Sequence, residues 1–350
     1  MTTPVGHFAP SDALLAHHGD RQAEPGLVDL AVNVRVDAPP EWLRRELAAV
    51  DLARYPDGAA ARAAVAVRHS RAEQDVLVTA GAAEAFVLVA RAFAPRRAVV
   101  VHPQFTEPEI ALRAAGHEVE RVVLEWPFTL DPVAVPDDAD LVVIGNPTNP
   151  TSVLHPAEIV RRLVRPGRVL VVDEAFADCV PGESESLAGV RDLPGVVVVR
   201  SLTKTWGLAG LRVGYVLAEP ALIRALAAAQ PRWAVSSPAL AACVACCAAS
   251  AVAEARSWAL GMGAERDLLV GLLAEVPGVR VVPNPRGSFV LAHVDDHDVR
   301  TSLLGRGFAV RRGDTFPGLG PAWIRIAVRE HQTSTALATA LKELTCPPIR

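Results

Sequence analysis

The 350-residue sequence predicts an α/β protein in which a mainly parallel sheet forms the larger part and a smaller α+β part follows it. Three observations support this prediction. Short runs of apolar, β-branched residues alternate with segments whose apolar residues recur at helical spacing. The runs are apolar on both faces, as expected for parallel strands covered by helices on both sides. Polar motifs follow several runs directly, at the edge of the sheet where ligands bind in such folds.

The N-terminal arm, residues 1–38, is expected to be irregular apart from a short alternating segment at 27–36, which is typical of an edge strand. Pro39 and Pro40 then precede apolar residues at helical spacing, so a helix is expected at 41–50. A turn at 54–58 and an Ala-rich helix follow, the helix covering residues 59–69.

Residues 75–86 have the pattern of a strand, a turn of small residues and a helix. The alternation that follows predicts strands at 98–101, 118–124, 141–144, 169–172 and 196–199, with helices at 107–115 and 156–163. Towards the C-terminus we expect helical segments at 240–260 and 262–273, strands at 279–282, 288–294, 308–310 and 324–328, and a helix at 333–344. The expected organisation is an arm at 1–40 that packs with the small domain, a large domain at 41–230 and a small domain at 231–350.

Composition limits the classes of function. The chain has 51% hydrophobic and 21% charged residues, as a soluble globular protein does. A net charge of -4, with arginines interspersed among acids, gives no basic field for nucleic acid. The first ten residues lack the features of a signal peptide, and the most apolar stretch, 238–253, is short for a membrane span. A cytoplasmic location without membrane or nucleic-acid partners is therefore expected.

Three of the five cysteines, Cys243, Cys246 and Cys247, lie close together in the sequence. A zinc site needs about four ligands, and no second Cys/His pair has suitable spacing. We interpret them as small apolar residues of a tightly packed helix, with metal binding as the minor alternative.

The sequence around residues 196–215 carries the strongest chemical signal. A β-branched run ends at Ser201, Leu202, Thr203 and Lys204, and Arg212 follows eight residues later. Lys204 and Lys342 are the only lysines among 35 basic residues. Schiff-base formation is chemistry that lysine performs and arginine does not, so Lys204 is a candidate to hold a carbonyl cofactor.

Two further motifs would suit a phosphate-bearing carbonyl cofactor. Asp173 comes directly after an apolar strand, where a carboxylate needs a cation such as a protonated pyridine nitrogen; the alternative is an aspartate that caps a following helix. Gly81, Ala82 and Ala83 stand between a strand and a helix, where free amides bind anions; the alternative is an ordinary βα turn.

These motifs together resemble the fold-type I pyridoxal-phosphate aminotransferase family over nearly the whole chain, and within it the branch of histidinol-phosphate aminotransferase and threonine-phosphate decarboxylase. The residues that carry the resemblance are Tyr55-Pro56, Gly81-Ala-Ala-Glu84, Phe105, Asn146-Pro-Thr-Asn149-Pro-Thr151, Asp173-Glu-Ala-Phe176, Ser201-Leu-Thr-Lys204 and Gly210-Leu-Arg212. The resemblance implies an aspartate aminotransferase-like fold, with a mainly parallel seven-stranded sheet in the large domain and a smaller α+β domain.

The resemblance also implies roles for these residues. Pyridoxal 5'-phosphate would be bound covalently by Lys204, with Asp173 at the pyridine nitrogen, Asn149 at the ring oxygen and Phe105 on the ring face. The phosphate would be held at the Gly81, Ala82 and Ala83 turn, by Ser201 with Thr203 beside it, by Arg212, and by Tyr55 of a neighbouring subunit. A homodimer with shared active sites follows from that last role. No metal is implied.

On the substrate side, the family uses the position of Arg325 to bind a carboxylate, a task that suits a guanidinium. His18, Asn33, Phe176 and Arg311 resemble the decarboxylase, in which the corresponding histidine and arginine help to bind the substrate phosphate. The alternative for Arg311 and its neighbour Arg312 is a solvated basic pair.

Three positions depart from the family pattern. Ser152 stands in place of the usual glycine, Arg35 in place of an asparagine, and Phe176 in place of a common tyrosine. Losing that phenol removes one hydrogen bond to the ring oxygen, an effect of about 1 kcal/mol. Arg35 is expected to reshape the substrate pocket or to add an anion contact there.

The sequence therefore predicts a pyridoxal-phosphate enzyme acting on a small phosphorylated amino acid, with decarboxylation of threonine O-3-phosphate in cobalamin synthesis as the first choice. A transaminase of the histidinol-phosphate type that uses 2-oxoglutarate is the main alternative. A non-catalytic binding protein stays open because of the departures. A dinucleotide-binding oxidoreductase is disfavoured, since Gly81-Ala-Ala-Glu84 is not the Gly-x-Gly-x-x-Gly fingerprint.

Overall fold

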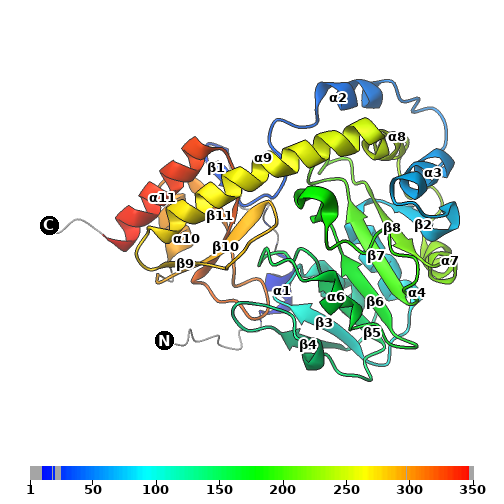
Figure 1. Ribbon diagram of the computed structural model, residues 1–350, viewed down its shortest axis with the longest axis horizontal. Coiled ribbons are helices and arrows are strands. Elements are labelled where there is room, and N and C mark those ends of the chain that lie inside the picture. The colour runs from blue at the N-terminus through cyan, green and yellow to red at the C-terminus, as the bar shows by residue number, and fades with distance from the viewer. Residues whose placement is uncertain (1–9, 18, 20–24, 297, 347–350) are drawn as a thin grey trace.

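The computed structural model describes residues 10–17, 19, 25–296 and 298–346, and within them the strands form one sheet of seven and one of five. Figure 1 shows the two sheets at opposite ends of the molecule, with the long helix α9 (Ala249–Ala274) running from one to the other. The domain limits expected from the sequence, at residues 40 and 230, remain a prediction.

The large sheet has the strand order β2-β8-β7-β6-β5-β3-β4. Its strands are β2 (Val76–Thr79), β3 (Ala98–His102), β4 (Val119–Val123), β5 (Leu141–Gly145), β6 (Val169–Asp173), β7 (Val196–Ser201) and β8 (Gly214–Ala218). All pair in parallel except β8, which runs antiparallel to both β2 and β7. The expected mainly parallel, seven-stranded sheet is confirmed.

Helices cover the large sheet on both faces, which explains the continuous apolar runs of the sequence. On β7, Val197 and Val199 pack with α4, α5 and α7, whereas Val196 and Val198 pack with α3 and α8 on the other face. Alternate side chains of one strand thus enter two separate cores. The helices of this part are α2 (Glu41–Ala48), α3 (Ala59–Arg68), α4 (Gly81–Ala92), α5 (Glu107–Ala114), α6 (Ala157–Arg161), α7 (Pro220–Ala229) and α8 (Ser237–Cys247).

The small sheet has the order β1-β11-β12-β10-β9 and packs against α9, α10 and α11. Its strands are β1 (Val28–Leu30), β9 (Val279–Val281), β10 (Phe289–Val294), β11 (Phe308–Arg312) and β12 (Trp323–Ala327), and its other helices are α10 (Val299–Leu304) and α11 (His331–Thr345). The edge strand expected in the N-terminal arm is β1, which pairs in parallel with β11.

Two expectations about helices were wrong. The segments at 240–260 and 262–273 are divided at Ala248, whose extended backbone (φ -62°, ψ 146°) separates α8 from α9 with a bend of 76°. Gly261 and Gly263 instead lie inside α9, because packing along the rest of the helix outweighs their low helix propensity. The short helix α1 (Asp12–Leu15) and helix α7 were not expected at all.

Within the described ranges, no single helix has both the length and the apolar character needed to cross a membrane. Helices α8 and α9 meet these two criteria only when they are taken together, and they are bent at Ala248. Cys243, Cys246 and Cys247 are buried on α8 as free thiols, as the interpretation of small apolar residues requires.

Candidate active site

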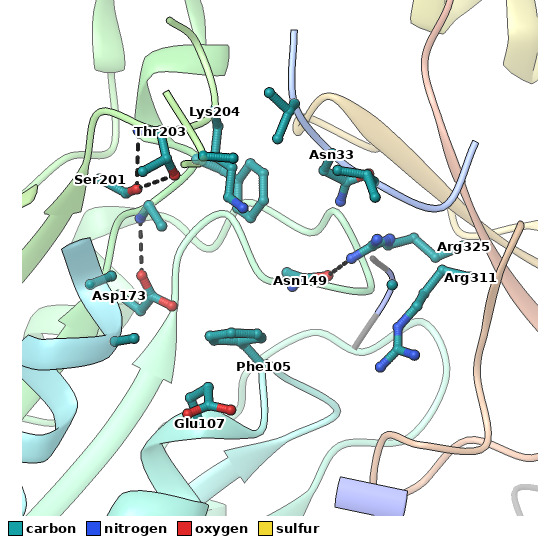
Figure 2. Close-up of a pocket in the computed structure, with 18 of the residues that line it drawn as sticks. Asn33, Phe105, Glu107, Asn149, Asp173, Ser201, Thr203, Lys204, Arg311 and Arg325 are labelled. Carbon is teal, nitrogen blue, oxygen red and sulfur yellow. Dashed lines mark hydrogen bonds between the residues drawn. The ribbon is translucent and has the colours of Figure 1, made fainter. Parts of the chain in front are cut away.

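A cavity of about 500 Å³ lies at the carboxyl ends of the parallel strands, and side chains from β11 and β12 of the small sheet complete its wall (Figure 2). Most of the residues that the sequence singled out line it. They are Asn33, Ala82, Ala83, Phe105, Asn149, Asp173, Phe176, Ser201, Thr203, Lys204, Arg212, Arg311 and Arg325. Segments far apart in the sequence therefore meet at one place.

Strand direction explains why the motifs converge. Because β2 and β7 are both antiparallel to β8, they run parallel to each other. Gly214, the first residue of β8, pairs with Thr79 at the end of β2 and with Ser201 at the end of β7. The Gly81 turn, Ser201 and Arg212 consequently share one edge of the sheet.

Asp173 and Lys204 form the charged pair on the large-sheet side of the cavity. The Asp173 carboxylate accepts a 3.0 Å hydrogen bond from the Ala175 amide, and burial raises its pKa to about 6. Burial also lowers the pKa of Lys204 to about 8, with a further contribution from the positive charges of Arg325 and Arg212. A buried carboxylate with a raised pKa, beside an amine with a lowered pKa, favours a cationic ring and an aldehyde as ligands.

The first turn of α4 forms one end of the cavity. Gly81 has a φ of +76°, and a Cβ there would lie 2.9 Å from Nη2 of Arg212, so glycine allows the guanidinium to approach the turn. The amides of Ala82 and Ala83 belong to the turn of the helix whose N–H groups have no intrahelical acceptor. The Ser201 and Thr203 hydroxyls are 2.8 Å apart beside it. This end is suited to a phosphate.

Arg325 lies on β12 of the small sheet, and its guanidinium donates hydrogen bonds to three uncharged oxygen atoms. Its Nη1 donates to Oδ1 of Asn149 at 2.6 Å, and its Nη2 donates to the Ala31 carbonyl. In the amide orientation that satisfies both groups, the Asn33 oxygen accepts from Nε at 3.2 Å and from Nη1 at 3.0 Å. Burial and the nearby charge of Arg311 lower the pKa of Arg325 well below its usual range, so an anionic ligand would be stabilised here.

Arg311 lies opposite Arg325 in the β11–β12 register and also lines the cavity. Only 2% of its surface is exposed, which rules out the solvated basic pair considered for it. Its Nη2 donates to the His17 carbonyl, and its Cζ lies 5.0 Å from the centroid of the Phe316 ring. Two guanidinium groups thus stand on the substrate side of one cavity, enough for a ligand with two anionic groups.

A buried ion-pair cluster supports the strands that carry Asp173 and Ser201. Arg200, which is 1% exposed, forms ion pairs with Glu174 at 3.2 Å, with Glu183 at 2.6 Å and with Asp178. Since Glu174 follows Asp173 and Arg200 precedes Ser201, the cluster ties together the carboxyl ends of β6 and β7.

Two of the predicted site residues that the structure describes, Tyr55 and Gly81, do not line the cavity. Tyr55 is 76% exposed and stacks on Trp233 with ring centroids 4.4 Å apart, so its proposed phosphate contact in a neighbouring subunit stays a prediction. Gly81 is the first residue of α4, and the next two residues, Ala82 and Ala83, line the cavity in its place. His18 lies outside the described residues.

Some residues that line the cavity were not among the candidates. Glu107, in the first turn of α5, stands two positions after Phe105, and an acid at that helix start was visible in the sequence. The others are small or apolar: Ala31, Val32, Val34, Ala175 and Ala209, which have no chemical signal of their own, and Gly19 and Phe316, whose segments share the resemblance to the decarboxylase.

The side chains fit pyridoxal 5'-phosphate at each of its polar ends. The α4 turn with Ser201 and Arg212 matches the phosphate, Asp173 matches a protonated pyridine nitrogen, and Lys204 matches the aldehyde. Because the Asn149 oxygen accepts from Arg325, its amide N–H groups remain to donate to the ring oxygen.

Comparison with known proteins gives a consistent picture. Residues 25–342 match the sequence profile described as aminotransferase class I and II. The chain is 53% identical over 323 residues to a protein named histidinol-phosphate aminotransferase of Mycobacterium bovis, covering 91% of this chain and 88% of that protein. It is 29% identical over 338 residues to the threonine-phosphate decarboxylase of Salmonella typhimurium, covering 91% of both chains.

Among solved structures, the histidinol-phosphate aminotransferase of Sinorhizobium meliloti, crystallised with pyridoxal 5'-phosphate, superposes with a TM-score of 0.81. The match covers 98% of this chain and 97% of that one at 22% identity, so it shows a shared fold.

Proposed function

The chain belongs to the class I and II aminotransferase family, and from this premise we propose that it transfers the amino group of a small phosphorylated substrate of the histidinol-phosphate type to 2-oxoglutarate. It is a pyridoxal 5'-phosphate-dependent enzyme. The observation that carries the proposal is one cavity with Lys204 and Asp173 on one side and two buried arginines, Arg311 and Arg325, on the other.

We assign the cofactor-side roles as follows. When bound, pyridoxal 5'-phosphate withdraws electrons from a bond at the α-carbon of the substrate. Asp173 would hold the pyridine nitrogen in its protonated form, and Phe105 would contact the ring face. The α4 turn, Ser201 and Arg212 would hold the phosphate. Lys204 would bind the cofactor through its amine and, once released, would carry a proton to and from the α-carbon, for which its lowered pKa of about 8 is suitable.

Arg325 and Arg311 would orient the substrate. A guanidinium binds a carboxylate or a phosphate through paired hydrogen bonds, and the low exposure of both side chains excludes competing water. Glutamate, the product of the second half of a transamination with 2-oxoglutarate, has two carboxylates for the two arginines. The 53%-identical relative, named a histidinol-phosphate aminotransferase, supports this choice.

Threonine O-3-phosphate decarboxylation, the first choice from the sequence, is the second candidate. Threonine phosphate bears a carboxylate and a phosphate, which the Arg311 and Arg325 pair could bind together. The relative with this activity in its name is only 29% identical. The role in cobalamin synthesis depends on this candidate.

One experiment separates the two candidates. The purified holoenzyme is offered histidinol phosphate or threonine phosphate, each with and without 2-oxoglutarate, and carbon dioxide and glutamate are measured. Glutamate formed from histidinol phosphate only when 2-oxoglutarate is present supports the transaminase. Carbon dioxide released from threonine phosphate without any keto acid would replace that proposal by the decarboxylase.

The non-catalytic alternative loses its support, because Lys204, Asp173 and Arg325 all reach one cavity in spite of the departures at Arg35 and Ser152. A cytoplasmic location and a homodimer with shared active sites are further parts of the proposal, the second resting on Tyr55.

A further inference from the structure

Ser152 lies in the loop that follows β5, residues 146–156, which also carries Asn149. Its side chain is fully buried and its φ is +63°, a conformation that favours glycine. Its hydroxyl oxygen accepts hydrogen bonds from the Gly287 amide at 2.8 Å and from the Arg286 amide at 3.1 Å. Ser152 thus keeps an unfavourable backbone conformation and makes contacts that glycine could not make.

The two amides belong to the segment that leads into β10 of the small sheet. Arg266, on α9, donates from Nη1 to the carbonyls of Arg286 and Gly287 at 3.2 and 3.4 Å. The 286–287 peptides are therefore fixed by a helix on one side and by Ser152 on the other. The Ser152 carbonyl also accepts from the Arg286 amide, at 2.8 Å, so the Gly287 amide is the one held by the hydroxyl alone.

This segment continues directly into the wall of the cavity. Phe289, two residues after Gly287, packs edge-on against Phe176 with ring centroids 4.9 Å apart, and Cζ of Arg325 lies 5.4 Å from the Phe289 ring centroid. A shift of residues 286–287 would displace Phe289, and with it the apolar surface on which the Arg325 guanidinium rests.

One loop therefore contacts the small sheet at two points. Asn149 bonds Arg325 itself, and Ser152 bonds the strand segment beneath it. We propose that Ser152 is a positioning residue: its hydroxyl fixes the 286–287 segment and so sets the location of Arg325 relative to Lys204, which determines how tightly a carboxylate is bound. The inference rests on the proposed carboxylate-binding role of Arg325 and adds a residue to it.

The residues assigned to the cofactor belong to the large-sheet part, so the Ser152 contacts should affect substrate binding and leave cofactor binding unchanged. Removing a hydrogen bond of this kind should weaken carboxylate binding by about three- to tenfold. Two substitutions separate the effect of the hydroxyl from the effect of the strained backbone conformation. Ser152→Gly removes the hydroxyl and relieves the positive φ, whereas Ser152→Ala removes the hydroxyl and keeps the strain.

The matched control is Thr148→Val in the same loop. The Thr148 hydroxyl is buried but donates to the Gly145 carbonyl at 2.7 Å, a contact that does not reach the small sheet. Three measurements are made on each holoenzyme: the dissociation constant of succinate by calorimetry, the cofactor absorbance spectrum, and hydrogen–deuterium exchange of the peptide covering residues 283–289.

We expect both Ser152 variants to bind succinate three- to tenfold more weakly, to keep the wild-type cofactor spectrum, and to exchange the 283–289 amides faster, while Thr148→Val matches wild type in all three. Wild-type affinity in Ser152→Gly would overturn the proposal, as would an effect confined to Ser152→Ala, which would indicate backbone strain. An equal effect of Thr148→Val, or a wild type that does not bind succinate, would overturn it too. Failure of the proposed substrates to turn over would leave these three measurements intact and count only against the proposed function.

Discussion

Nη1 of Arg325 donates a 2.6 Å hydrogen bond to Oδ1 of Asn149 and thereby joins β12 of the small sheet to the loop after β5 of the large sheet. The other partners of this guanidinium, Ala31 and Asn33, are also neutral oxygen acceptors from a distant part of the chain. A buried cation that donates only to neutral oxygens and lies near Arg311 is stabilised more by a bound anion than a solvated arginine would be. This arrangement supports the proposed binding of a carboxylate at Arg325.

Replacing Arg325 by Gln should raise the KM for 2-oxoglutarate by about 10- to 150-fold, since a hydrogen bond to a charged group contributes roughly 1.5–3 kcal/mol. Arg329→Gln is the matched control. Arg329 bonds the carbonyls of Asp29 and Val32 in the same arm but does not line the cavity. Steady-state kinetics checks the prediction, and an equal rise in KM for both variants would mean that arm packing, and not the carboxylate contact, causes the effect.

Lys204→Ala should abolish the visible absorbance of the bound cofactor and lower kcat by about 10⁴-fold or more, because proton transfer and covalent attachment are both lost. Lys342 is the only other lysine of the chain and lies exposed on α11, so Lys342→Ala should behave as wild type. Absorbance spectra and turnover assays test both variants. Full activity in Lys204→Ala would remove the central residue of the proposed site.

Asp173→Asn should have opposite effects on stability and on activity. Burial raises the Asp173 pKa from 3.8 to about 6, so the ionised carboxylate destabilises the cofactor-free fold above pH 6, and this penalty disappears below about pH 4. The cofactor-free variant should be more stable by roughly 3 kcal/mol at pH 7 and by little at pH 4. Its kcat should fall on the order of 10²–10³-fold, since the charge facing the pyridine nitrogen is lost.

Denaturant unfolding of the cofactor-free proteins at the two pH values measures the first effect, and turnover at saturating substrate measures the second. A variant that is less stable than wild type at pH 7 would show that Asp173 already has a cationic partner in the empty site.

Capture of the cofactor should depend on pH through Lys204. Its amine has a pKa lowered to about 8, and only the neutral amine adds to an aldehyde. The second-order rate of absorbance change after mixing cofactor-free protein with pyridoxal 5'-phosphate should therefore rise with pH and level off above about 8. An exposed lysine would level off near its ordinary pKa of about 10.4, so a plateau reached only there would contradict the burial of Lys204.

Arg200→Met should lower the free energy of unfolding by about 3–5 kcal/mol, because it leaves Glu174, Asp178 and Glu183 without their shared buried cation. Arg54→Ala removes one partner of an exposed ion pair with Asp51 and should change stability by less than about 0.5 kcal/mol. Chemical denaturation measures both. A loss below about 1 kcal/mol in Arg200→Met would mean that Arg68, which also pairs with Asp178 and Glu183, compensates for the missing charge.

Much of the fold could be predicted because the signals are local. The consecutive valines of β7 are apolar because both faces of the strand are buried, and the apolar residues of α4 recur at helical spacing because one face of the helix is buried. Small residues after β2 mark the turn at the start of α4. The break between α8 and α9 could not be predicted in this way. It falls at Ala248, a residue with high helix propensity, so the packing of the two helices, and no local signal, decides it.

The sequence by itself determined the candidates for the cofactor side. The scarcity of lysine singled out Lys204; Asp173 and Ser201 end the parallel strands β6 and β7, and Arg212 precedes β8. It also marked Ser152 as a departure without showing what the hydroxyl does. Only the tertiary structure decided that Ser152 bonds the 286–287 segment and that Arg311 and Arg325 are cross-strand neighbours on one side of the cavity. The physical reason is that these contacts join residues more than 130 positions apart or depend on strand register, and neither is set by local propensity.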